Sequence, residues 1–165
     1  MALVVLWYME FHYTGPQTEF ENLLGGYFYI NAIGPIEHGD ERKFSDFLRA
    51  VDPPPRATVY IDSSGGNVEA AIAIGRDIRD FWFSTAIGRY VLEPTSEPSS
   101  ITPRKLIPGR CMSAATLIYL GGRLRYFSQG STFGVHQFSF QNPSPEDVGR
   151  SQSPTRNELS DIMGL

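Results

Sequence analysis

Three short segments of this 165-residue chain carry groups that could together perform acyl transfer. Ser113 follows a turn at Gly109 and begins a short apolar run that ends at Gly121-Gly122, a pattern typical of a serine at the start of a helix. A serine in that place is commonly an N-cap, whose hydroxyl accepts a hydrogen bond from the first helical turn. The same hydroxyl can be a nucleophile when a general base lies within reach. Taken alone, this segment favours the N-cap role.

A glycine pair, Gly65-Gly66, lies between an apolar run typical of a buried strand and a helical pattern that starts at Val68. Glycines in such a turn let backbone N–H groups approach a ligand closely, as an oxyanion hole requires. A plain strand-to-helix turn has the same composition. The pair lacks the third glycine of a dinucleotide fingerprint and the Gly-Lys-Ser/Thr of a P-loop.

His136 is the third candidate, because a serine hydroxyl needs a general base at neutral pH. It lies 23 residues after Ser113, at the end of an apolar strand pattern, whereas His12 and His38 lie in poorly patterned surroundings. A lone histidine on a strand is often structural, bonded to a neighbouring carbonyl. The order of glycine pair, serine and histidine on one scaffold favours a site over three separate structural roles.

The elements that would position these groups alternate between strand and helix, which predicts an α/β fold. Apolar and β-branched runs predict strands, and apolar residues at helical spacing predict helices. The predicted order is strand 27–33, helix 40–51 with Asp40 as N-cap, strand 57–61, helix 68–82, strand 85–88, the short helix after Ser113, and strands 123–127 and 132–138. Right-handed crossovers then give a mostly parallel sheet.

Other parts of the chain have no clear period. We expect a single domain over 1–165, with a core at 27–140, an irregular N-terminal extension at 1–26 and an incomplete tail at 141–165. Met1–Met9 is apolar and predicts a strand or packed extension. The segment 92–108, rich in proline, serine and threonine, predicts a surface loop or extended hairpin before the serine turn.

Composition narrows the function. The net charge is −4 without a basic cluster, which argues against nucleic acid and anionic membranes as partners. A single cysteine, Cys111, excludes an intramolecular disulfide, and no residues have metal-ligand spacing, so we expect no metal and no cofactor. The opening apolar stretch is too short to span a membrane and lacks the features of a signal peptide. We expect a cytoplasmic protein without an integral membrane segment in this chain; the alternative is a periplasmic or membrane-tethered longer form.

These residues resemble the ClpP-type serine peptidases of the ClpP/crotonase superfamily. Tyr60-Ile61-Asp62-Ser63-Ser64-Gly65-Gly66-Asn67-Val68 is similar to the strand–turn–helix that supplies part of the family's oxyanion hole. Cys111-Met112-Ser113-Ala114-Ala115 and Gly134-Val135-His136-Gln137 resemble its nucleophile helix and its His-Gln strand. The resemblance covers roughly residues 27 to 140. The Cys-x-Ser-Ala form is most similar to a ClpP-like bacterial branch.

The resemblance implies Ser113 as nucleophile and His136 as general base, with the N–H groups of Gly66 and Ala114 as the oxyanion hole. It also implies a peptide or protein substrate and a homo-oligomer. The sequence departs from the family pattern at Ser64, where the family has proline, and in the 92–108 insertion. The family's triad aspartate lies in a segment absent from this chain, which would be truncated at its C-terminus; Asp147 and Asp161 are weak candidates for its place.

Three functions therefore stay open. The leading hypothesis is a serine hydrolase that cleaves peptide bonds through a Ser113 acyl-enzyme. A second is a catalytically silent ClpP-like interaction domain, favoured by the missing aspartate. A third is crotonase-type chemistry on an acyl-coenzyme A, where the same backbone hole would stabilise an enolate; the absence of a basic cluster for the phosphates argues against it.

Overall fold

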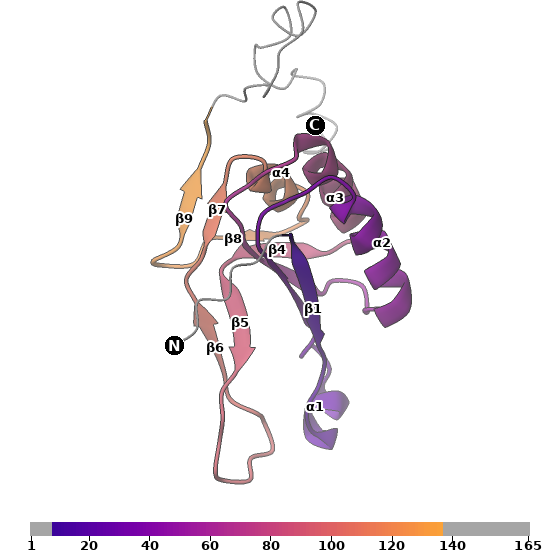
Figure 1. The fold of residues 1–165 in the computed structure, drawn as a ribbon. Helices are drawn as coiled ribbons and strands as arrows, with labels where there is room; N and C mark the ends of the chain where they lie inside the picture. Colours follow the sequence, from indigo (N-terminus) through magenta and orange to yellow (C-terminus); the bar gives the residue numbers. More distant parts are fainter. Residues whose placement is uncertain (1–7, 137–165) are drawn as a thin grey trace, which may run out of the picture.

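A computed structural model describes residues 8–136, and a five-stranded sheet forms the centre of this part of the chain (Figure 1). The strand order is β1-β2-β3-β4-β8. The strands are β1 (Glu10–Thr14), β2 (Tyr29–Ile33), β3 (Thr58–Asp62), β4 (Ser84–Ile87) and β8 (Arg125–Tyr126). β2, β3, β4 and β8 pair in parallel, and β1 pairs antiparallel to β2. The predicted α/β fold with a mostly parallel sheet is confirmed.

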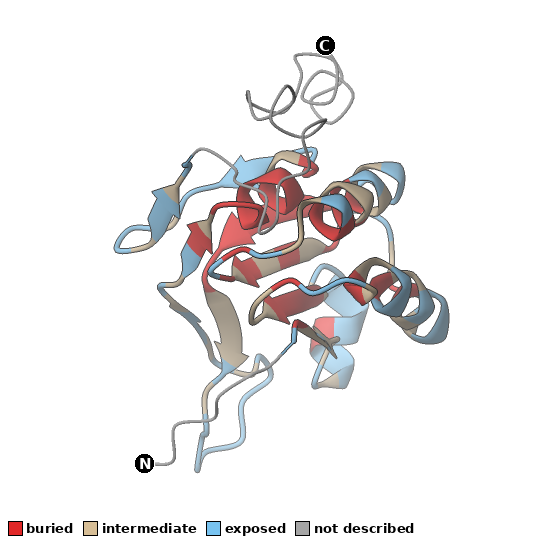
Figure 2. Cartoon of the chain, turned by 45° about the horizontal axis from the view of Figure 1, so that its top comes forward, coloured by how far each residue is buried: buried red, intermediate tan, exposed pale blue. Residues whose placement is uncertain are grey.

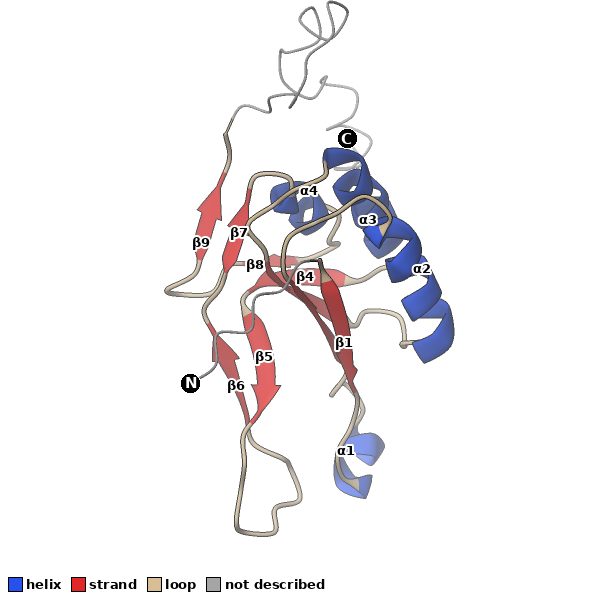
Figure 3. Ribbon diagram, viewed as in Figure 1, coloured by secondary structure: helices blue, strands red, loops and turns tan. Residues whose placement is uncertain are grey.

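Three helices gather on one side of this sheet (Figure 3). They are α2 (Asp40–Val51), α3 (Val68–Asp80) and α4 (Ala115–Leu120). Apolar side chains at helical spacing, such as Ile74 and Ile78 of α3, are fully buried beneath them. Alternate residues of β3, Val59 and Ile61, meet them from the sheet. The core is therefore the layer between the helices and the sheet (Figure 2).

Glycines set the spacing between α3 and α4. A Cβ at Gly75 would lie 2.8 Å from the carbonyl oxygen of Leu117, and one at Gly121 would lie 2.2 Å from the carbonyl oxygen of Gly75. Any larger residue would push the two helix backbones apart. The glycine that ends α4 is thus also what lets this short helix pack tightly on its neighbour.

The segment 10–26, predicted to be irregular, contains two regular elements. β1 extends the sheet, and α1 (Glu19–Leu24) follows it with Thr18 as N-cap, whose hydroxyl accepts a 3.1 Å hydrogen bond from the Glu21 N–H. Gly15 and Pro16 separate the two elements and interrupt the apolar pattern, so neither element was predicted from the sequence. β1 forms because β2 supplies its hydrogen-bonding partner, which a local pattern cannot indicate.

The start of α2 also differs from the prediction. Gly39, with φ 97°, occupies the cap position, and Asp40 is the first helical residue. The Asp40 carboxylate accepts hydrogen bonds from the N–H groups of Glu37 (2.8 Å) and Met9 (3.3 Å). Asp40 therefore fixes the chain before the helix instead of capping the helix itself.

The proline-rich insertion is a hairpin, the second of the two predicted alternatives. It pairs β5 (Arg89–Leu92) with β6 (Arg104–Ile107) antiparallel, so it begins three residues earlier than predicted. β5 lies against the sheet face opposite the helices, where the Asn31 side-chain amide donates to the carbonyl of Tyr90 and its oxygen accepts from the Tyr90 N–H.

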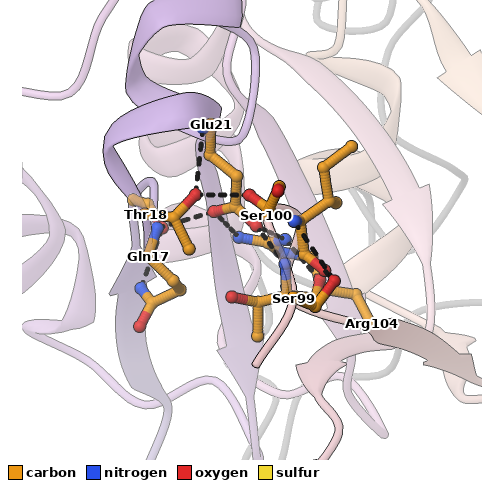
Figure 4. Close-up of polar contacts among 9 residues, drawn as sticks. Gln17, Thr18, Glu21, Ser99, Ser100 and Arg104 are labelled. Atoms are coloured by element: carbon orange, nitrogen blue, oxygen red, sulfur yellow. Dashed lines mark hydrogen bonds and ion pairs between the residues drawn. The ribbon is translucent and has the colours of Figure 1, made fainter. Parts of the chain in front are cut away.

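A buried ion pair joins this hairpin to α1 (Figure 4). Both nitrogens of the Arg104 fork donate to the Glu21 carboxylate at 2.7 Å, and the two side chains are 3% and 0% exposed. The N–H groups of Gln17 and Thr102 donate to the same carboxylate at 2.6 Å. Thr18 adds a hydrogen bond to the Ser100 carbonyl. Segments about 80 residues apart are thereby held together.

The last described strands are shorter than predicted. β7 (Arg110–Met112) pairs in parallel with β9 (Thr132–Gly134), and β8 contains only two residues. No helix in residues 8–136 is both long and apolar enough to cross a membrane. Residues 1–7 and 137–165 lie outside the described part of the chain. The prediction for most of the Met1–Met9 stretch and the predictions for the tail, which include Asp147 and Asp161, fall there.

Candidate active site

Ser113 occupies the tight connection between β7 and α4 in a backbone conformation unusual for a serine. Its φ is 55°, in the left-handed region that favours glycine, and its side chain is almost fully buried. Its N–H donates to the Gly134 carbonyl at 2.8 Å. Non-glycine residues held in this region cluster at functional sites, because the strain persists only where the surroundings enforce it.

The structure shows that Ser113 is not the N-cap of α4. Ala114 occupies the cap position, and no side chain caps this helix. The first helical turn is instead satisfied by the Ser113 backbone carbonyl, which accepts from the N–H (3.0 Å) and hydroxyl (2.7 Å) of Thr116. The N-cap interpretation was therefore wrong, and the serine hydroxyl is not engaged in holding the helix.

The glycine turn after β3 packs directly on the serine turn. A Cβ added at Gly65 would lie 2.7 Å from the Cβ of Ser113 and 2.6 Å from the carbonyl oxygen of Met112. The segments that lead into the two turns are also hydrogen-bonded to each other: Ser63 N donates to Arg110 O (2.6 Å), and Met112 N donates to Ser63 O (3.1 Å). Glycine at position 65 is thus required both for its φ of +96° and for the contact.

The N–H of Gly66 points away from the rest of the backbone pairing at this turn. Gly66 forms a parallel bridge with Ile36, in which Ile36 N donates to Gly65 O (2.9 Å) and Asn67 N donates to Ile36 O (2.7 Å). In a parallel bridge of this form, the N–H of the central residue faces the opposite side. A Cβ added at Gly66 would lie 2.1 Å from the carbonyl oxygen of Ile36, so only glycine fits at this position.

Ala114 brings a second backbone N–H to the same place. Its nitrogen lies 3.2 Å from the Cβ position of Gly65, beside the serine turn. Among residues 8–136, no acceptor is hydrogen-bonded to the Ala114 N–H or to that of Gly66. The buried Ala114 and the exposed Gly66 thus each have a backbone N–H without an acceptor among residues 8–136. These donors belong to the two turns that meet at Ser113, an arrangement suited to binding an oxygen that gains negative charge.

β9 leads His136 toward the same edge. Met112 of β7 pairs with Gly134 of β9, so Ser113 and the residues after Gly134 leave adjacent parallel strands at their carboxyl ends. His136 lies two residues beyond β9 and is exposed. The three predicted segments thus converge, whereas the candidates for a third triad residue, Asp147 and Asp161, lie outside the described part of the chain.

Asp62 is a residue at this site whose part the sequence did not indicate. Its carboxylate accepts a hydrogen bond from the Arg110 N–H (2.9 Å), at the start of the strand that carries Ser113, and one from Arg89 Nε (2.7 Å), at the start of the hairpin. It therefore joins three segments at the carboxyl end of β3. The only signal in the sequence was its position at the end of a parallel strand, where binding sites of α/β proteins commonly form.

Cys111, the single cysteine of the chain, is a second possible nucleophile beside Ser113. Burial raises the pKa of the Cys111 thiol to about 12, so this neighbour of Ser113 is not a thiolate nucleophile at neutral pH. Within residues 8–136, no group of three histidine, cysteine, aspartate or glutamate side chains is arranged to hold a metal ion.

Comparison with known proteins connects this fold with ClpP. The sequence matches no model of a known protein family, and no curated protein sequence matches it. Among solved structures, ClpP1 from Listeria monocytogenes superimposes with a TM-score of 0.55 at 18% identity, covering 81% of this chain and 72% of that one. A mutant of the same ClpP1 gives the same TM-score and identity over 82% and 72%. This likeness shows that the chain has a ClpP-like fold.

Proposed function

We propose that this protein is a serine hydrolase of the ClpP type that cleaves peptide bonds through an acyl-enzyme on Ser113. The observation that carries the proposal is the strained backbone of Ser113, whose φ of 55° holds the residue in the turn without using its hydroxyl as a helix cap. The ClpP-like fold supports a peptidase over other hydrolases.

The reaction would follow from groups already described. Ser113 Oγ attacks the carbonyl carbon of the substrate while His136 accepts the hydroxyl proton. The N–H groups of Gly66 and Ala114 donate to the carbonyl oxygen as it becomes negative, which stabilises the tetrahedral intermediate. His136 returns the proton to the leaving amine as the C–N bond breaks. Water, deprotonated by His136, then hydrolyses the ester and frees the serine.

A fluorophosphonate probe tests the nucleophile, because it reacts with activated serines and not with ordinary ones. We expect labelling of the wild-type protein and none of Ser113→Ala. Ser64→Ala is the matched control, since Ser64 lies exposed on the adjoining glycine turn and should leave labelling unchanged. Labelling of Ser113→Ala at the wild-type level would contradict the assignment.

A labelled serine does not identify the substrate, so a second experiment addresses the peptide bond. We expect wild-type protein to hydrolyse a mixture of fluorogenic peptides and to leave acyl-coenzyme A thioesters intact. Failure of both labelling and hydrolysis in a folded protein would favour the catalytically silent interaction domain instead.

A further inference from the structure

An open pocket lies at the end of the sheet opposite Ser113. The serine and glycine turns follow the carboxyl ends of the strands, whereas this pocket surrounds the amino end of β4, where Trp82 precedes Ser84 and Arg125 of β8 pairs with Thr85. Its volume is about 440 Å³, within the range of small-molecule sites. It is lined by Arg79, Asp80, Trp82, Gly121, Gly122, Arg123 and Arg125.

Three of the lining residues are arginines, and none of them has a carboxylate partner within the described residues. Asp80 is the single acidic residue of the lining, so the pocket carries an excess of two positive charges. Arg79 and Arg125 both donate to the carbonyl oxygen of Leu120, at 3.4 and 3.0 Å, which brings their cationic groups close together. Like charges at this separation repel, and an anion between them would relieve that repulsion.

The carbonyl groups at the end of α4 account for part of the clustering of Arg79 and Arg125, but they use only some of the N–H donors of the two side chains. Cations near a helix C-terminus are favourable, and Arg125 also reaches the Gly122 carbonyl at 3.4 Å. A guanidinium carries five N–H donors, so most donors of the pair remain for a ligand. The Nε of Arg79 is buried and has no partner among the described residues.

Arg123 is held beside this pair by an aromatic contact. Its guanidinium lies 5.8 Å from the ring centre of Trp82, which is 58% exposed. Stacking of this kind orders a guanidinium without using its hydrogen-bonding edge. Three guanidinium groups thus border one pocket from α3, the α4–β8 connection and β8. This basic cluster differs from the sequence-based expectation of none, because the fold brings Arg79 of α3 together with two arginines that are distant from it in the sequence.

We propose that this three-arginine pocket binds a phosphate group of a small molecule. A phosphate monoester carries close to two negative charges at pH 7 and three acceptor oxygens, which matches the excess charge and the forked donors better than a single carboxylate does. The pocket holds more volume than a phosphate alone fills, so the ligand class is an organic phosphate. The inference does not depend on Ser113 being catalytic.

Isothermal titration calorimetry of the full chain with pyrophosphate at constant ionic strength tests the pocket. We expect saturable one-site binding to the wild-type protein and to Ser113→Ala, weakened about 10-fold or more in Arg125→Gln and in Arg123→Gln. Arg49→Gln is the matched control: it removes the same charge from an exposed pair with Asp46 on α2 and should bind as wild type. Fluorescence of a Trp7→Phe variant, in which Trp82 is the remaining tryptophan, should report the same affinity.

Three results would overturn the proposal. The first is a lack of saturable binding up to 10 mM pyrophosphate. The second is an equal loss of affinity in Arg49→Gln, which would indicate general charge attraction. The third is citrate binding as tightly as pyrophosphate, which would contradict the assignment to phosphate. Because Arg123 and Arg125 are exposed, circular dichroism of both variants should match wild type, so that lost binding is not lost folding.

Discussion

At the scale of single residues, Ser113 combines backbone strain with a hydroxyl that makes no hydrogen bond to another residue between 8 and 136. The strain is imposed by its surroundings: its N–H is fixed to β9, its carbonyl holds the first turn of α4, and Gly65 packs on its Cβ. A left-handed conformation disfavours folding by about 1 kcal/mol in a non-glycine residue. We therefore expect a serine at position 113 to favour nucleophilic attack while it lowers the free energy of unfolding.

Ser113→Gly tests this trade-off. Glycine adopts the φ of 55° without strain, so we expect the free energy of unfolding to rise by about 1 kcal/mol in urea denaturation, while fluorophosphonate labelling disappears. Ser113→Ala keeps the strain and should lose labelling without a gain in stability. A less stable Ser113→Gly protein would show that the turn is not strained.

Gly65 offers a second test at the same scale. In Gly65→Ala, the new Cβ would meet the Met112 carbonyl oxygen at 2.6 Å in addition to the unfavourable φ of +96°, and we expect a loss of roughly 3 kcal/mol together with labelling. Gly26→Ala is the control, because its φ is +95° and nothing lies within 4 Å of its Cβ position. It should lose about 1 kcal/mol and keep labelling. Equal losses in the two variants would argue against the contact between the turns.

At the scale of elements, the hairpin is held both by aromatic packing of Tyr90 on the sheet and by the buried Glu21–Arg104 ion pair. The Arg104 fork, followed by backbone hydrogen bonds, lowers the pKa of the Glu21 carboxyl from 4.5 to about 2. A carboxyl whose pKa is lower in the folded protein stabilises it at pH values above 4.5 and loses that contribution as the pH falls toward 2. Acid should therefore loosen α1 and the hairpin.

Acid unfolding followed by circular dichroism measures this contribution. We expect wild-type stability to fall between pH 4.5 and 2, and we expect Glu21→Gln to be less stable at pH 7 with a flatter profile over that range. Glu93→Gln, which breaks an exposed 3.7 Å pair with Lys105 on the same hairpin, should follow the wild-type profile. A Glu21→Gln profile as steep as wild type would place the acid sensitivity elsewhere.

The elements predicted from the sequence are those whose own apolar pattern indicates which face is buried. β3, α3 and β4 follow from local apolar periodicity. The Gly65-Gly66 and Ser113 segments were expected to belong to one site because they occur together with His136 and resemble the ClpP-type motifs. β1 and α1 were missed because their stability comes from distant partners, β2 and Arg104. The N-cap error at Ser113 has the same origin, since only the contacts with Gly65 and β9 force its positive φ. The roles of Ser113 and His136 stay predictions.

At the scale of the whole molecule, Cys111 reports on global opening. It is fully buried in the main core, and its pKa of about 12 reduces the thiolate fraction about a thousandfold at neutral pH. We expect iodoacetamide to alkylate it only when the core opens, so that the rate follows unfolding as urea is added. Ser64→Cys, exposed near the site, should react at once in the same protein. Fast alkylation of Cys111 in the wild type would show that the core opens locally.

The anchored hairpin has a consequence for how the chain tolerates being cut. Its tip extends away from the body (Figure 1), and residues 94–101 are exposed, while β5–β6 pairing and the Glu21–Arg104 contact hold both sides of the tip. Two fragments that meet between Thr95 and Pro98 should therefore associate when co-expressed and copurify as a folded pair. Copurification should weaken when the fragment ending at Thr95 carries Glu21→Gln, although β4–β8 pairing and α3–α4 packing still join the two fragments. The tip of the hairpin would then be a suitable site at which to divide the protein into two fragments that reassemble.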